Sequence, residues 1–84
     1  MKVINRKDYD KKNGILIDVR HPLDYEKEKH HPDSRNIYYE KLMYNPEKYL
    51  NKASKYYLTC TRGFLSKKCI KTLEILGYDV TLVR

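Results

Sequence analysis

The sequence predicts a single α/β domain built on a small, mostly parallel sheet of four to five strands. Runs of β-branched and apolar residues alternate with helical patterns along the chain, and this order indicates a parallel sheet with right-handed crossovers. The 84 residues provide material for one hydrophobic core. No repeat, low-complexity block or linker interrupts them, so we expect one domain over residues 1–84.

The first half of the chain begins with two predicted strands. Residues 3–4 form a short edge strand, and a brief helix follows over residues 5–10. Residues 15–19 are an almost continuous apolar run, which is typical of a strand buried on both faces. Pro22 then suits the first turn of a short helix, where its missing N–H costs no hydrogen bond.

The middle of the chain carries weaker patterns. Residues 29–34 indicate a loop, and residues 36–39 indicate a third short strand. A helical pattern over residues 40–50 is interrupted by Asn45-Pro46. Proline breaks the hydrogen-bond ladder of a helix, so we expect two helical pieces here.

The last third has the clearest pattern. Residues 56–60 are rich in strand-forming residues, and residues 80–83 form the closing strand. Between them we expect a helix over residues 65–76, ended by Gly77. Its apolar side chains fall on one helical stripe: Leu65, Cys69, Ile70, Leu73 and Leu76.

Charge and composition limit the classes of function. The net charge is +7, and residues 51–84 carry seven cations against only Glu74 and Asp79, which favours an anionic partner. No apolar run approaches the length of a membrane span, and residues 1–13 lack the apolar segment of a signal peptide. Two cysteines are too few for a disulfide scaffold. We expect a cytoplasmic protein that binds no membrane.

The most informative position is Cys60, at the carboxyl end of a predicted strand and just before a helix. Ligands bind at this edge of α/β sheets, and the unpaired N–H groups at a helix start hold anions and stabilise a thiolate. Arg62 adds positive charge, Gly63 permits a tight loop, and Lys67 and Lys68 follow in the first turn. The alternative is a buried, inert cysteine, which is common in protein cores.

Other side chains have both a functional and a structural interpretation. Cys69 is either a core residue or a partner for Cys60, and its place on the apolar stripe favours the core. Asp18 and Arg20 end the first central strand, where a charge pair bracing the structure is expected. Ser66 stands where a cysteine phosphatase needs arginine to clamp phosphate, so phosphatase chemistry is not expected.

Two aromatic patterns are weaker. His30 and His31 have no third ligand at metal-site spacing, so we expect local hydrogen bonds and no metal site. The pairs Tyr38-Tyr39 and Tyr56-Tyr57 suggest stacking platforms for nucleic acid. Alternate residues of a strand face opposite sides, so one tyrosine of each pair is expected in the core and no nucleic-acid partner is expected.

The chain resembles the rhodanese-like family of single-domain sulfurtransferases along essentially its whole length. Residues 60–66 (Cys-Thr-Arg-Gly-Phe-Leu-Ser) resemble the family's active-site loop, residues 17–25 its first signature and residues 30–37 its second. Residues 73–80 match the end of its helix and its last strand. The chain departs from the family pattern at Leu65, where many members carry arginine, and in the second signature.

The resemblance implies a three-layer α/β/α fold, truncated here at its C-terminus, because the family's closing turn and helix do not follow the last strand. It also implies that Cys60 is the catalytic residue. Its thiolate would attack the outer sulfur of a donor such as thiosulfate, release sulfite and carry a persulfide, with no cofactor. The loop residues would bind the substrate: Thr61, Arg62, Gly63, Phe64, Leu65 and Ser66.

The same resemblance suggests partners and supporting residues. Arg20 would support the loop together with Asp18, while Arg62 would attract a small anionic sulfur donor. The acceptor would be a thiol or cyanide, and a sulfur-relay protein is a further expected partner. The alternative is a non-catalytic module of the same fold, which would bind an acidic partner through the basic C-terminal third.

Overall fold

Five parallel strands form one sheet in the order β1-β5-β4-β2-β3. The computed structural model describes residues 1–84. The strands are β1 (Lys2–Ile4), β2 (Ile15–Asp18), β3 (Ser34–Asn36), β4 (Lys55–Thr59) and β5 (Asp79–Val83). The helices are η1 (Arg6–Asp8), α1 (Pro22–Lys27), α2 (Tyr39–Tyr44), α3 (Pro46–Tyr49) and α4 (Phe64–Ile75).

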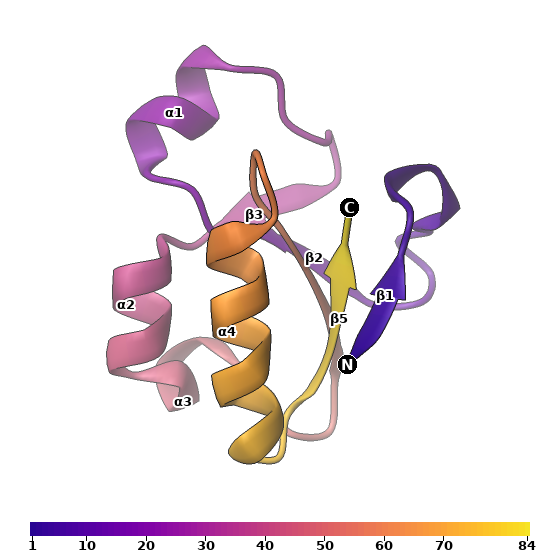
Figure 1. Cartoon of the computed structure of the whole chain (residues 1–84), viewed down its shortest axis with the longest axis vertical. Helices are drawn as coiled ribbons and strands as arrows, with labels where there is room; N and C mark the ends of the chain where they lie inside the picture. The colour runs from indigo at the N-terminus through magenta and orange to yellow at the C-terminus, as the bar shows by residue number, and fades with distance from the viewer.

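Three helices cover one face of the sheet. In Figure 1, α2 and α4 stand side by side, and α3 continues from α2. The core between these helices and the sheet includes Leu42 from α2, Leu58 from β4, Ile70 and Leu73 from α4, and Leu82 from β5. The apolar stripe predicted for α4 therefore faces the sheet.

The opposite face has a thinner cover. Leu16, Tyr57 and Thr81 lie in register across β2, β4 and β5 on this face. The ring of Tyr9, which follows η1, packs edge-on against Tyr57 with 5.2 Å between ring centroids. Gly14 lies close to this contact, since a Cβ there would come within 2.9 Å of the Tyr57 ring. The three-layer arrangement is thus completed by a turn and a loop on this side.

The parallel α/β fold predicted from the sequence is confirmed, with all five strands present. The two helical pieces expected around Asn45-Pro46 are α2 and α3. Two local predictions are wrong. The helix expected over residues 5–10 is the single 3₁₀ turn η1 because Tyr9 is already extended, and the strand expected over 36–39 is Ser34–Asn36 because Tyr39 begins α2.

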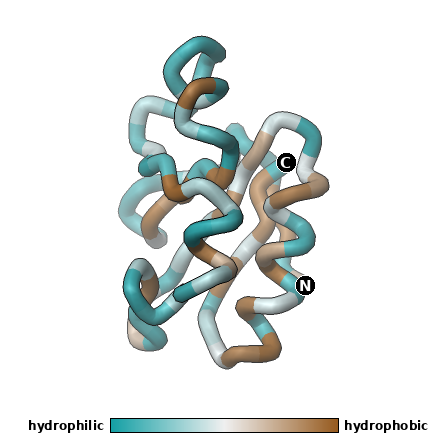
Figure 2. The backbone as a smooth tube through the Cα atoms, turned by 90° about the vertical axis from the view of Figure 1, so that its left-hand side faces the viewer, coloured by the Kyte–Doolittle hydropathy of each residue, from teal (hydrophilic) through white to brown (hydrophobic).

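The surroundings of α1 are the most polar part of the chain. Figure 2 shows mostly hydrophilic backbone in α1 and the loop after it, whereas hydrophobic stretches lie along the strands and α4. No helix combines the length and the apolar character that crossing a bilayer requires. The carboxyl ends of β4 and β2 meet at the edge of the sheet near α1, and the candidate site lies there.

Candidate active site

The loop after β4 holds the Cys60 thiol against the first turn of α4. Gly63 adopts a left-handed conformation, with φ at 79°, as the N-cap of that helix. The turn brings Ser66 back to Cys60, so that the Ser66 amide donates to Sγ at 3.4 Å and its hydroxyl lies 3.3 Å from Sγ. The Ser66 hydroxyl also donates to the Gly63 carbonyl at 3.3 Å. The predicted loop therefore closes around the sulfur.

The amides between Cys60 and Ser66 have no acceptor within the protein. The backbone N–H groups of residues 61–65 make no hydrogen bond, whereas the Lys67 amide bonds the Gly63 carbonyl. No acidic side chain lies in the first turn of α4. The loop therefore presents free donors and the positive end of a helix of 12 residues, an arrangement that stabilises negative charge.

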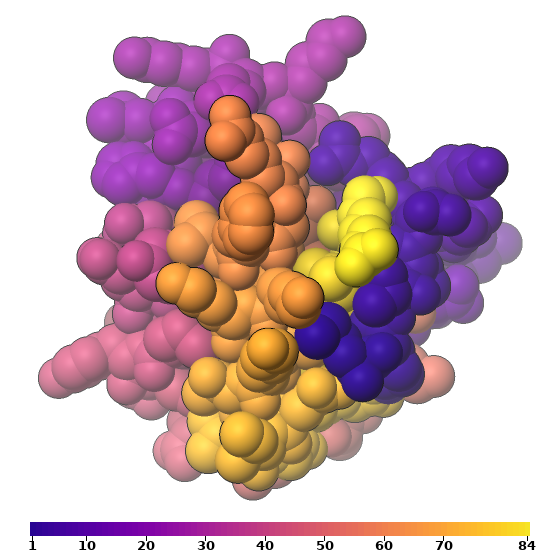
Figure 3. All heavy atoms as spheres, in the orientation of Figure 1, coloured from indigo at the N-terminus to yellow at the C-terminus, as the bar shows by residue number.

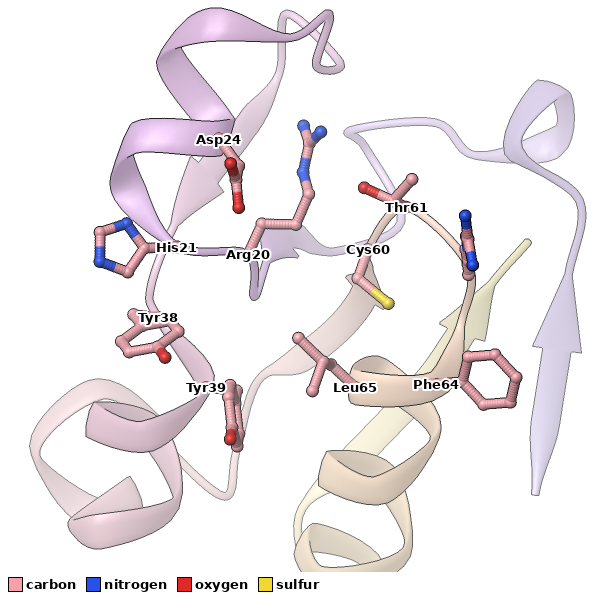
Figure 4. A pocket seen from close by; sticks show the side chains of 10 residues that line it. Arg20, His21, Asp24, Tyr38, Tyr39, Cys60, Thr61, Phe64 and Leu65 are labelled. Carbon is pink, nitrogen blue, oxygen red and sulfur yellow. The ribbon is translucent and has the colours of Figure 1, made fainter.

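A pocket of about 350 Å³, the front pocket, opens beside this loop. Figure 4 shows the thiol between Thr61 and Leu65, with Tyr38 and Tyr39 on the far wall. Cys60 is 8% exposed, so the thiol lies at the inner end of the pocket rather than on its rim. The pocket is lined by Arg20, His21, Asp24, Tyr38, Tyr39, Cys60, Thr61, Arg62, Phe64 and Leu65.

Some of the predicted loop residues line this pocket, and others lie in the structure behind it. Thr61, Arg62, Phe64 and Leu65 line the pocket with Cys60. Ser66 is fully buried, and it is the loop residue whose side chain lies within hydrogen-bond distance of the sulfur. These four residues therefore shape the space above the thiol, Gly63 forms the turn into α4, and Ser66 fixes the position of the sulfur.

Asp18 and Arg20 form a buried ion pair at the end of β2, with 3% and 7% exposure. Two guanidinium nitrogens of Arg20 donate to the carboxylate of Asp18, at 2.9 and 3.0 Å, and the Arg20 amide donates to it at 3.0 Å. The hydrogen bonds that Arg20 donates to Asp18 raise the pKa of Arg20 above its ordinary value, although burial opposes this. Arg20 also donates to the Lys29 carbonyl at 3.1 Å, so the pair braces the loop after α1.

Sequence reasoning missed four residues of the front pocket: His21, Asp24, Tyr38 and Tyr39. The ring of His21 packs edge-on against Tyr38, with 5.0 Å between centroids, and its Nδ1 caps α1 by accepting from the Leu23 amide. Tyr38 and Tyr39 follow β3, and His21 follows β2. Their positions after parallel strands were the available signal, because such residues share one edge of the sheet.

Cys69 belongs to the core. It is fully buried on the inner face of α4, and burial, followed by the nearby Cys60, raises the pKa of its thiol from 9.0 to about 11. A protonated thiol without solvent access is a poor nucleophile. The structure therefore supports the interpretation of Cys69 as a packing residue.

The raised pKa of Cys69 predicts a pH-dependent contribution to stability. The folded state holds this proton more tightly than the unfolded chain, so the contribution is intact below pH 9 and is lost as the pH rises from 9 towards 11. We expect Cys69→Ala to be less stable than wild type at pH 8, by about 1 kcal/mol. The deficit should shrink at pH 10 and above, as measured by urea unfolding. A deficit that is constant up to pH 10.5 would contradict this assignment.

The weaker aromatic candidates are structural. His30 Nδ1 lies 2.6 Å from the Tyr25 carbonyl oxygen, and its ring stacks on the Tyr25 ring at 3.6 Å between centroids. Tyr56 is buried among the core residues, whereas Tyr57 is on the other face with Tyr9. These side chains have the local contacts that the sequence predicted for them.

Comparison with known proteins agrees with this geometry. No curated protein shows a significant sequence match to the chain. A rhodanese-related protein of Thermoplasma volcanium superposes with a TM-score of 0.87 at 27% identity, covering 100% of this chain and 84% of that one. A rhodanese-like domain protein of Staphylococcus aureus gives 0.80 at 25% identity, covering 96% and 82%.

A larger protein contains a similar unit. The reduced CoADR-RHD of Bacillus anthracis superposes with a TM-score of 0.86 at 25% identity, covering 98% of this chain but 15% of that chain. The family model of the rhodanese-like domain matches residues 3–84. The strand order, the loop that encloses Cys60 and this match lead to one conclusion: the chain belongs to the rhodanese-like domain family, a family of sulfur-transfer proteins.

Proposed function

We propose that this protein is a sulfurtransferase that moves sulfane sulfur from thiosulfate, or a similar anionic donor, to a thiophilic acceptor. The observation that supports this most directly is the position of the Cys60 sulfur. It lies at the inner end of the front pocket, inside a loop whose amides at residues 61–65 have no acceptor. A sulfur atom added to Sγ would extend into this ring of donors.

The chemistry has two steps. The Cys60 thiolate attacks the outer sulfur of thiosulfate, the sulfur–sulfur bond of the donor breaks, and its electron pair leaves with sulfite. Cys60 then carries a persulfide with one negative charge on its terminal sulfur. Cyanide or a thiolate attacks that terminal sulfur, and the Cys60 thiolate is regenerated. Each step is a nucleophilic displacement at sulfur, so neither needs an external oxidant or reductant.

The surrounding residues have separate roles in this proposal. The loop amides stabilise the negative terminal sulfur in the way that an oxyanion hole stabilises oxygen. Arg62 on the pocket wall attracts the dianionic donor. Arg20, held by Asp18, supports the opposite wall. The tyrosine side of the front pocket leaves room for an acceptor with an apolar body, such as a larger thiol or a sulfur-relay protein.

Intact-mass spectrometry after incubation with thiosulfate tests the proposal. Wild type should gain the mass of one sulfur atom, and addition of cyanide should remove it. Cys69→Ala, the matched control, should gain the same mass because it keeps Cys60. Cys60→Ser should gain nothing. Wild type that stays at its original mass while remaining folded would contradict the enzyme proposal and favour the non-catalytic binding module.

A further inference from the structure

A second cavity, the rear pocket, borders the Cys60 loop from the other side. Its volume is about 410 Å³, and the buried side chains of Leu82 and Val83 contribute to its lining. The front pocket draws on residues after β2 and β3, while the rear pocket draws on η1 and the end of β5, so the two pockets flank the end of β4. Four cationic residues line it: Arg6, Arg62, Lys67 and Arg84.

The backbone holds two of these cations together although they are far apart in sequence. The Arg6 amide donates to the Arg84 carbonyl at 2.9 Å, and the Arg84 amide donates to the Ile4 carbonyl at 3.0 Å. Figure 3 shows the end of β5 (yellow) between the first residues of the chain (indigo) and the loop before α4 (orange). Arg62 and Lys67 come from that loop and the first turn of α4. Three separate segments therefore contribute the positive charge.

No carboxylate side chain balances this charge. The lining of the rear pocket contains no Asp or Glu. The ion pairs of the molecule involve the amino terminus, Lys2 and Arg20, and none includes the four cations of this pocket. Like charges gathered around one cavity repel each other, and a bound anion would relieve that repulsion.

We propose that the rear pocket is a binding site for a multiply charged oxyanion, with a phosphate or diphosphate group as its ligand class. Three of the four cations are arginines, and the guanidinium fork pairs two N–H donors with two oxygens of a phosphate. Leu82 and Val83 give the pocket an apolar lining, which offers water no hydrogen bonds and so limits hydration of the neighbouring cations. Arg6, Lys67 and Arg84 line this pocket and not the front pocket, whereas the two pockets share four residues of the Cys60 loop: Cys60, Thr61, Arg62 and Phe64.

Calorimetric titration with sodium diphosphate and with inorganic phosphate tests the site. Arg6→Gln/Arg84→Gln should bind diphosphate about tenfold more weakly than wild type, because two charge-assisted contacts are removed. The matched control is Arg35→Gln/Lys71→Gln, which loses the same charge from two exposed residues away from the pocket and should bind like wild type. Diphosphate binding and sulfur loading are measured separately: wild type that binds diphosphate but gains no sulfur from thiosulfate would contradict only the proposed enzyme, and the reverse result would contradict only this site.

Amide chemical shifts of the wild type give a second measurement that needs no variant. Diphosphate should perturb Arg6, Lys67 and residues 82–84 more strongly than Tyr38 and Tyr39. Equal affinities for the two double variants would overturn the proposal, because net charge alone would then explain binding. Shift changes confined to the front pocket would also overturn it. Tighter binding of a single-stranded oligonucleotide, with an affinity that grows with its length, would replace the proposal with a nucleic-acid surface.

Discussion

Cys60→Ala is expected to reduce sulfur transfer from thiosulfate to cyanide by at least about a thousandfold. The reaction proposed above passes through a covalent bond to Sγ, and removing the nucleophile of a covalent mechanism removes nearly all of its rate. The measurement is the initial rate of thiocyanate formation at saturating thiosulfate and cyanide. The substitution truncates a side chain that is 8% exposed at the end of a pocket, so the variant should remain folded.

Two further variants make this rate interpretable. Cys69→Ala should retain a rate close to that of wild type, because Cys69 lies in the core under α4. Ser66→Ala should retain Cys60 but lose the hydroxyl that lies 3.3 Å from Sγ, and its rate should fall between the other two. A Cys60→Ala protein as active as wild type would show that transfer uses another group or occurs without the protein.

The fold was predictable because its signals are local. The run at residues 15–19 is apolar enough to predict a central strand. In the structure it contains β2, which pairs with β3 on one side and with β4 on the other. The apolar stripe on α4 and the proline that begins α3 are likewise visible over a few residues. The strand expected over residues 36–39 was misplaced because Tyr38 and Tyr39 have high strand propensity. In the structure, the Ile37 and Tyr39 amides donate to the carbonyls of Asp18 and Val19, at the end of β2. The helix α2 then begins at Tyr39.

The site was predictable only in part because it joins distant segments. Cys60 and Ser66 are close in sequence, so a loop and a helix start were enough to bring them together. The far wall of the front pocket needs β2 to lie beside β4 and β3 to lie beside β2, which no local pattern in the sequence indicates. The same holds for Arg6, which reaches the rear pocket only because β1 pairs with β5. Sheet order, rather than residue type, determines these neighbours.

Asp18→Ala is expected to lower the free energy of unfolding by about 3 to 5 kcal/mol. It removes the carboxylate that accepts hydrogen bonds from three N–H groups of Arg20, whose side chain is 9% exposed, and leaves that charge buried without its main partner. A small domain has a total stability of about 5 to 15 kcal/mol, so the variant should unfold at markedly lower urea concentration. Equilibrium unfolding followed by circular dichroism measures the loss.

A double-mutant cycle separates the pair from the cost of each truncation. Arg20→Ala removes the buried charge as well as its contacts to the Glu28 carboxylate and the Lys29 carbonyl. Asp18→Ala/Arg20→Ala should therefore be less destabilised than the sum of the two single variants, by at least about 1 kcal/mol. Additive losses would show that the two side chains stabilise the fold independently. Coupled losses would mean that Asp18 acts through Arg20, because the carboxylate holds the guanidinium against the loop after α1 and keeps Arg20 on the wall of the front pocket.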